Sequence, residues 1–171
     1  FTSIGSSAFF GTIFSYDYTA DNLNYLISRS GQTAYLVDGV SASGSVIIPN
    51  QVSTAYVKLI CANAFKYNSS LTSITIPGSV TSIGNGVFGY CSSLTSVTFE
   101  GDAPTFGTNV FDNSNSATIY YNSNNSGYSG WSGTVAGRPA VQTNTLTFTL
   151  NGDSKCYIYS NFLETASGSL D

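Results

Sequence analysis

LTSITIPGSVTSIGNGVFGYCSSL, residues 71–94, is one 23-residue period of a repeat followed by the first residue of the next. Moving back 23 residues from residues 80–99 places matching side chains at eight positions: Val57, Ile60, Ala64, Phe65, Asn68, Leu71, Ile74 and Ile76. Moving forward by 23 residues from Ile83 and Phe88 gives Phe106 and Phe111. A fixed period of about 20–50 residues with matched apolar positions indicates a solenoid.

The period contains a strand followed by turns. Ser73-Ile74-Thr75-Ile76 alternates polar and apolar residues, which is typical of a strand with one buried face. Residues 96–99 repeat this alternation, and residues 118–121 repeat it after a slip of one residue in the register. One coil cannot bury its own apolar side, so the coils must stack. Stacking predicts two core columns, Phe65–Phe88–Phe111 and Ile60–Ile83–Phe106.

This pattern resembles the BspA-type leucine-rich repeats, whose coil is roughly L-x-x-I-x-I-P-x-x-V-x-x-I-G-x-x-A-F-x-x-C-x-x-L. The resemblance covers residues 57–111 closely and residues 1–10 and 112–141 more loosely. The departures are Cys61 in place of Gly, Asn68 in place of Cys, and residues 100–102 in place of Ile-Pro. The resemblance implies a leucine-rich-repeat solenoid of short parallel β-strands and turns with minimal helix, in a secreted or cell-surface protein.

A second period of 122 residues lies over the first, since Tyr35 and Leu36 return as Tyr157 and Ile158. It predicts a β-hairpin-like unit at residues 24–50 that leads into a coil strand, and a truncated second copy at residues 147–171. The remaining segments are the end of a preceding coil (1–23), three coils (51–122), and an aromatic, Gly-, Ser- and Asn-containing loop and linker (123–146). We expect the sequence to be an excerpt of a longer array; the alternative is a protomer whose open ends meet in a filament.

The composition excludes several classes of function. Ser, Thr and Asn make up 62 of the 171 residues, whereas only 8% are charged and the formal net charge is −4. The chain has no His, which excludes Ser-His-Asp and Cys-His catalysis and His-ligated metals. Few cations argue against nucleic-acid binding. No apolar run reaches about 18 residues, so we expect no membrane insertion.

Three groups of reactive side chains have simpler explanations than chemistry. Cys61, Cys91 and Cys156 show no paired spacing, which favours buried, inert thiols. The carboxylates of Glu100 and Asp102 lie on a turn beside Gly101, which favours a solvated turn over acid–base catalysis. The loop Asp112-Asn113-Ser114-Asn115 has too few carboxylates for a tight calcium site, and calcium binding there stays an open question. We expect no catalytic residue, no metal site and no cofactor.

The candidate binding residues lie outside the core: Ser73, Thr75, Ser96, Thr98, Thr118, Tyr120, Tyr128 and Trp131. The hydroxyl side chains predict a neutral ladder on the solvent side of the strands, which suits docking and is also ordinary for an exposed sheet face. The three aromatic residues belong to a segment of Asn, Ser and Gly typical of adaptable recognition loops. For Trp131 we favour packing onto the solenoid; for Tyr120 and Tyr128 both interpretations stay open.

These features lead to two hypotheses. The first is a non-enzymatic binding or adhesion module that recognises an extracellular protein or glycan through the solenoid face. The second is a structural subunit or spacer of a fibre or surface layer, which self-associates end to end through open solenoid ends.

Overall fold

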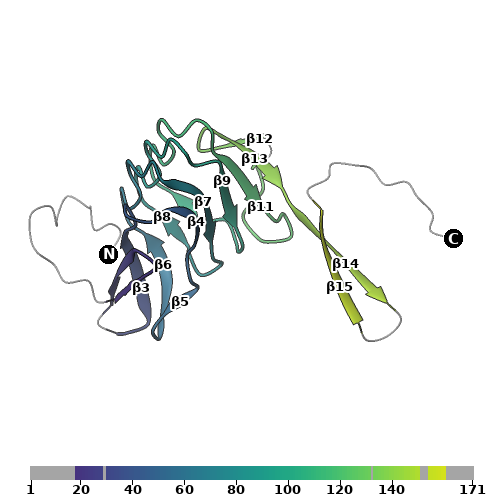
Figure 1. Cartoon of the computed structure of the whole chain (residues 1–171). Coiled ribbons are helices and arrows are strands. Elements are labelled where there is room, and N and C mark those ends of the chain that lie inside the picture. The colour runs from purple at the N-terminus through teal and green to yellow at the C-terminus, as the bar shows by residue number, and fades with distance from the viewer. Residues whose placement is uncertain (1–17, 29, 132, 151–153, 161–171) are drawn as a thin grey trace, which may run out of the picture.

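The computed structural model describes residues 18–28, 30–131, 133–150 and 154–160. The chain winds through two sheets, and each coil contributes a strand to both of them (Figure 1). These described residues form no helix, and therefore none long and apolar enough to cross a membrane. The structure is a β-solenoid, as the 23-residue period predicts.

Sheet A contains seven of the strands in the described ranges, in the spatial order β1-β2-β3-β6-β8-β10 with β5 paired to β6. Their bounds are β1 (Tyr18–Ala20), β2 (Leu23–Ile27), β3 (Thr33–Asp38), β5 (Gln51–Val52), β6 (Ala55–Ile60), β8 (Ser82–Ile83) and β10 (Thr105–Phe106). The strands β3, β6, β8 and β10 run parallel, as expected for successive coils of a solenoid.

Sheet B contains six of the described strands, in the order β12-β13-β11-β9-β7-β4. Their bounds are β4 (Gly44–Ile47), β7 (Leu71–Ile76), β9 (Ser96–Phe99), β11 (Thr118–Tyr121), β12 (Gly133–Val135) and β13 (Arg138–Gln142). Strands β4, β7, β9, β11 and β13 are parallel neighbours, whereas β12 joins β13 in an antiparallel hairpin. The inward residues Ile74, Val97 and Ile119 are paired in register and buried.

The predicted phenylalanine column fills the space beside the turns. The ring of Phe88 stacks on Phe65 with 5.5 Å between centroids and on Phe111 with 5.3 Å. All three rings are buried. The second column is also in register, since Ile83 pairs with Ile60 and with Phe106.

A buried polar column holds each turn onto the preceding coil. The Asn68 side-chain amide donates hydrogen bonds to the carbonyls of Gly39 (3.1 Å) and Ala42 (2.7 Å). In the next coil the Cys91 thiol donates to the Phe65 carbonyl (3.1 Å), and after it the Ser114 hydroxyl donates to a carbonyl one coil back. A hydrogen-bond donor is therefore what this position requires, which explains why Asn and Ser substitute for Cys.

The hairpin unit at residues 24–50 is built into the stack. Strands β2 and β3 are antiparallel, and β3 pairs in parallel with β6 of the first full coil. In the second copy, the backbone forms the antiparallel hairpin β14 (Asn144–Leu150) and β15 (Ser154–Ser160). Two predicted segments lie partly outside the described residues: residues 1–17 of the preceding coil, and residues 161–171 of the truncated second hairpin unit.

The segment 123–146, which we expected to be loop and linker, contains two strands of sheet B. Ala136 and Gly137 both have positive φ, which fits a two-residue hairpin turn between β12 and β13. Strand β13 then pairs with β11, placing Ala140 beside Ile119. Arg138 and Pro139 interrupt the alternation that identified the other strands, which is why the sequence pattern missed this one.

The phenylalanine column gives the first prediction. Replacing the central ring in Phe88→Ala leaves a cavity between two coils, and we expect a loss of about 3–5 kcal/mol in the free energy of unfolding. Urea unfolding followed by circular dichroism measures it. Ser92→Ala, at an exposed position of the same coil, is the control and should change stability by less than about 0.5 kcal/mol. An equal effect of the two variants would show that the column does not hold the coils together.

Candidate binding surface

Two straight rows of side chains run across the outward face of sheet B. The first row is Ser45–Ser73–Ser96–Thr118, and the second is Ile47–Thr75–Thr98–Tyr120–Val141. Each row follows the register of parallel strands, so its members are separated by about 4.8 Å. We call this surface the hydroxyl face. It unites six predicted binding residues: Ser73, Thr75, Ser96, Thr98, Thr118 and Tyr120.

The chemistry of the hydroxyl face is neutral and capable of hydrogen bonding. None of its nine side chains is charged, and the central Ser and Thr side chains are half-buried. Ile47, at one end of its row, is 68% exposed. The other end carries the half-buried Tyr120 and Val141. The face therefore offers hydroxyl groups in a fixed spacing between two less polar ends.

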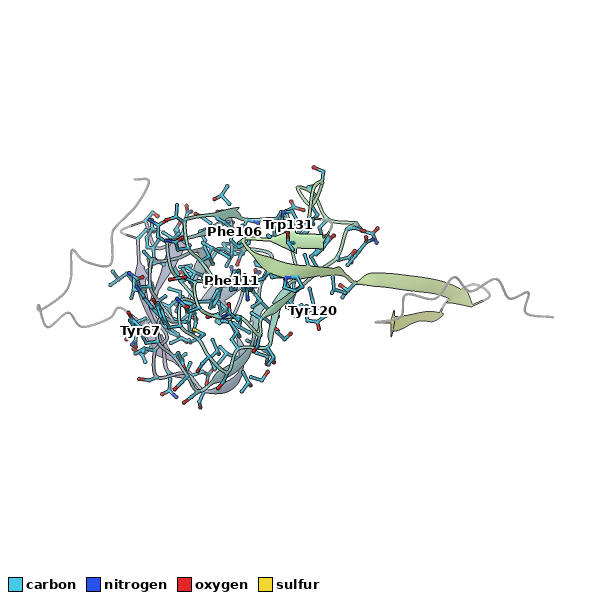
Figure 2. The ribbon with its side chains drawn as sticks, turned by 90° about the horizontal axis from the view of Figure 1, so that it is seen from above. Tyr67, Phe106, Phe111, Tyr120 and Trp131 are labelled. Atoms are coloured by element: carbon cyan, nitrogen blue, oxygen red, sulfur yellow. The ribbon has the colours of Figure 1, made fainter. Side chains whose placement is uncertain are left out.

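Trp131 packs against the core instead of facing a partner. Its ring lies 4.7 Å from the Tyr128 centroid and 5.5 Å from Phe99, Phe106 and Tyr121. Figure 2 shows it beside Phe106. The cluster covers the core where the described coils end, which is the packing that we favoured from the sequence.

Tyr128 is also part of this cluster and does not contribute to the hydroxyl face. Its ring is buried against Tyr121, and its hydroxyl donates to the Gly101 carbonyl (2.6 Å). Burial and the nearby Asp102 carboxylate raise the pKa of the Tyr128 hydroxyl to about 12. Of the two interpretations left open for Tyr128, the structure shows packing, and Tyr128 no longer counts among the predicted binding residues, because the loop folds back onto the turn at residues 100–102.

The sequence pattern missed a second group of exposed aromatic residues. Tyr67 and Tyr90 occupy equivalent turn positions in successive coils, and their rings are 5.0 Å apart. Both have a left-handed backbone, with φ of 66° and 60°, as does Asn113 at the same position of the next coil. This conformation costs an ordinary L-residue about 1–2 kcal/mol and suits Asn better. The third coil has the less strained residue, so the two tyrosines are not required by the backbone.

Comparison with known families agrees with the geometry of the coils. The profile of the BspA type leucine rich repeat region matches residues 40–130, in six copies. The chain belongs to this family. No curated protein sequence matches it.

Solved structures of leucine-rich repeat proteins are similar to the solenoid. A leucine rich cell surface protein from Faecalibacterium prausnitzii is 28% identical over 60% of this chain and 29% of its own, with a TM-score of 0.51. A T. pallidum leucine rich repeat protein is 15% identical, with a TM-score of 0.43 over 61% of this chain and 71% of its own. The chain thus spans less than a third of the length of the F. prausnitzii protein.

The cysteines of this leucine-rich repeat chain whose side chains are described are buried and free. Burial raises the pKa of the Cys61 and Cys91 thiols from 9.0 to about 11. A neighbouring backbone hydrogen bond from Asn68 opposes the shift at Cys91. These thiols therefore remain protonated at neutral pH, which fits packing and not nucleophilic chemistry. The side chain of Cys156 lies outside the described residues.

The acidic candidates contact other parts of the chain. Asp102 accepts a hydrogen bond from the Ser126 backbone N–H (2.7 Å), which fixes the loop at residues 122–131 on the turn. At the suggested calcium loop, the Arg138 guanidinium donates to the Ser114 carbonyl (3.2 Å) and to Asn115 Oδ1 (3.3 Å). A cation of the protein thus already contacts two of the oxygens that a calcium ion would need. The described residues contain no cluster of three acidic, Cys or His side chains.

The raised thiol pKa values predict slow alkylation. In a Cys156→Ser variant at pH 8, we expect Cys61 and Cys91 to resist iodoacetamide, because about one thiol in a thousand is ionised and both are shielded. The reaction should speed up as pH rises toward 11. Peptide mass spectrometry measures the modified fraction, and urea-unfolded protein is the control that should react within minutes. Rapid alkylation of either residue in the folded protein would contradict its burial.

Proposed function

We propose that the chain is a non-enzymatic binding or adhesion module that recognises an extracellular protein or glycan through the hydroxyl face. The in-register rows of Ser and Thr on sheet B are the observation that carries this proposal. A parallel solenoid repeats the same donor and acceptor groups along one direction, so an extended partner can make the same contact several times. Family membership and the similar cell surface protein support a secreted or surface location.

The neutral character of the face determines how it would bind. Hydroxyl groups both donate and accept hydrogen bonds, and the exposed Ile47 and half-buried Tyr120 add apolar contacts at the ends. Since no charged side chain belongs to the rows, long-range attraction contributes little and salt should have little effect on affinity. The described side chains give no support for a catalytic role: the Asp102 carboxylate holds a loop, and the thiols of Cys61 and Cys91 are buried.

A charge placed in the middle of the face tests the proposal. We expect Thr98→Lys to lower affinity at least about tenfold, because the ammonium group must be desolvated against a neutral partner. Binding is measured by surface plasmon resonance on laminin, collagen, fibronectin and a set of neutral glycans. Ser82→Lys is the matched control, since Ser82 is a half-buried hydroxyl residue on a strand of sheet A. The proposal would be rejected if the wild-type chain bound none of these ligands. It would also be rejected if Thr98→Lys and Ser82→Lys lowered the affinity equally.

End-to-end assembly is the second candidate function. Strand β4 pairs with β7 on one side, and no described strand pairs with its other edge. Ile47 on this strand is largely exposed. Unpaired edges with an apolar side chain favour strand addition by another chain.

If β4 is an assembly edge, Ile47→Lys should abolish concentration-dependent association of the protein. Light scattering at increasing protein concentration provides the measurement, and Ser82→Lys again serves as the control. A wild-type protein that stays monomeric at millimolar concentration would exclude this candidate.

A further inference from the structure

Tyr67 and Tyr90 form an exposed stacked pair that is separate from the hydroxyl face. The two rings are tilted by 30°, and the side chains are 65% and 42% exposed. They lie on turns that lead from sheet A to sheet B. Figure 2 shows Tyr67 at one margin of the molecule and Tyr120 farther along the stack of coils. The pair is therefore a distinct surface feature.

Backbone hydrogen bonds hold both turns in fixed positions. The Tyr67 N–H donates to the Gly89 carbonyl (2.9 Å), and the Tyr90 N–H donates to the Asp112 carbonyl (2.7 Å). These bonds join each turn to the next coil. The Lys66 ammonium lies 5.3 Å from the Tyr67 ring centroid. A partner would thus meet two stacked rings on a backbone that is already held, which lowers the entropy lost on binding.

The tyrosine column ends after Tyr90, and a hollow lies beside the next position of the column. The third residue of this column is Asn113, so no tyrosine ring follows Tyr90 in the next coil. A hollow of about 430 Å³ opens next to Asn113, and its polar lining includes Asp112, Asn113, Asn115 and Arg138. Asn113 therefore connects the aromatic pair to the hollow, whose lining contains neither tyrosine.

We propose that the tyrosine pair and this hollow form a binding site for a neutral glycan chain. A pyranose ring has an apolar face of C–H groups, which packs on an aromatic ring, and a rim of hydroxyl groups, which needs both donors and acceptors. The tyrosines supply the first requirement. Asn113 and Asp112 supply the second, whereas Arg138 and Asn115 Oδ1 are already hydrogen-bonded to each other. The charges of Asp112 and Arg138 offset each other.

The backbone strain supports selection of the rings for binding. Asn113 shows that an Asn fits this turn without the strain of a tyrosine, yet two coils carry Tyr. The aromatic patch is small and bordered by polar groups, whereas a protein partner that binds through apolar contact needs a larger continuous surface. This inference does not depend on the proposed function, because it concerns other residues, and both tyrosines lie on the turns between the two sheets and not on the strands of sheet B.

The test uses variants that the fold already tolerates. Tyr67→Asn and Tyr90→Asn place in the first two coils the residue that the third coil has, so we expect no loss of thermal stability. Tyr56→Thr is the matched control, because Tyr56 is 45% exposed, lies near a lysine in the same way, and belongs to a strand of sheet A. Isothermal titration calorimetry with cellohexaose, chitohexaose, maltohexaose and mannohexaose measures binding. A proline decapeptide is titrated separately and represents the alternative, a peptide partner.

We expect at least one hexasaccharide to bind the wild-type chain, with affinity at least tenfold lower in Tyr90→Asn and unchanged in Tyr56→Thr. Asn113→Gly keeps a residue suited to the left-handed backbone and removes the amide, so it should weaken binding without unfolding the turn. Raising the salt concentration should have little effect. Binding of no hexasaccharide, binding of the proline peptide alone, or equal affinity in Tyr90→Asn and wild type would overturn the proposal. Thr98→Lys should leave hexasaccharide binding at this site intact, which separates this result from the test of the hydroxyl face.

Discussion

Parallel pairing of successive coils at a nearly constant offset is the constraint on which the rest of the structure depends. It places each side chain directly above its counterpart, as in Ser73 above Ser96 and Phe65 above Phe88. The turns obey the same rule, because the N–H of Phe65 donates to the Val87 carbonyl at 3.0 Å. Close stacking also limits the side chains at the turns. A Cβ on Gly84 would lie 2.5 Å from the backbone nitrogen of Ala62.

The constraint acts differently on buried and exposed columns. Inside, shape decides, so Phe65, Phe88 and Phe111 are identical and the polar column needs only a donor that reaches the preceding coil. Outside, the backbone sets position and spacing but leaves the side chain open. The hydroxyl face uses this freedom to repeat one chemistry. The column Tyr67–Tyr90–Asn113 instead changes from tyrosine to asparagine at its third member. All three residues have the same left-handed backbone, so the backbone conformation does not explain the change of side chain.

This difference explains how much of the structure could be predicted from the sequence. The core columns, the one-residue slip that pairs Ile119 with Val97, and the register of the hydroxyl rows follow from periodicity alone. Strand β13 could not be found in this way, because Arg138 and Pro139 hide its alternation. The burial of Tyr128 depends on where a loop docks, which no local pattern encodes. Tyr67 and Tyr90 were missed because a left-handed tyrosine is a backbone property without a sequence signature.

The end of the stack shows how the chain resolves the conflict between repetition and closure. Each coil leaves an apolar side for the next one, so the last described coil needs a different cover. Trp131 and Tyr128 provide it as an aromatic layer over Phe99 and Phe106, and hydrogen bonds from Tyr128 and Asn125 to the turn at residues 100–102 hold the layer in place. Aromatic residues in this cover are explained by packing. Exposed aromatic residues elsewhere on the solenoid are not explained in this way. Tyr67 and Tyr90 cover no open core, and their stacked side chains are 65% and 42% exposed.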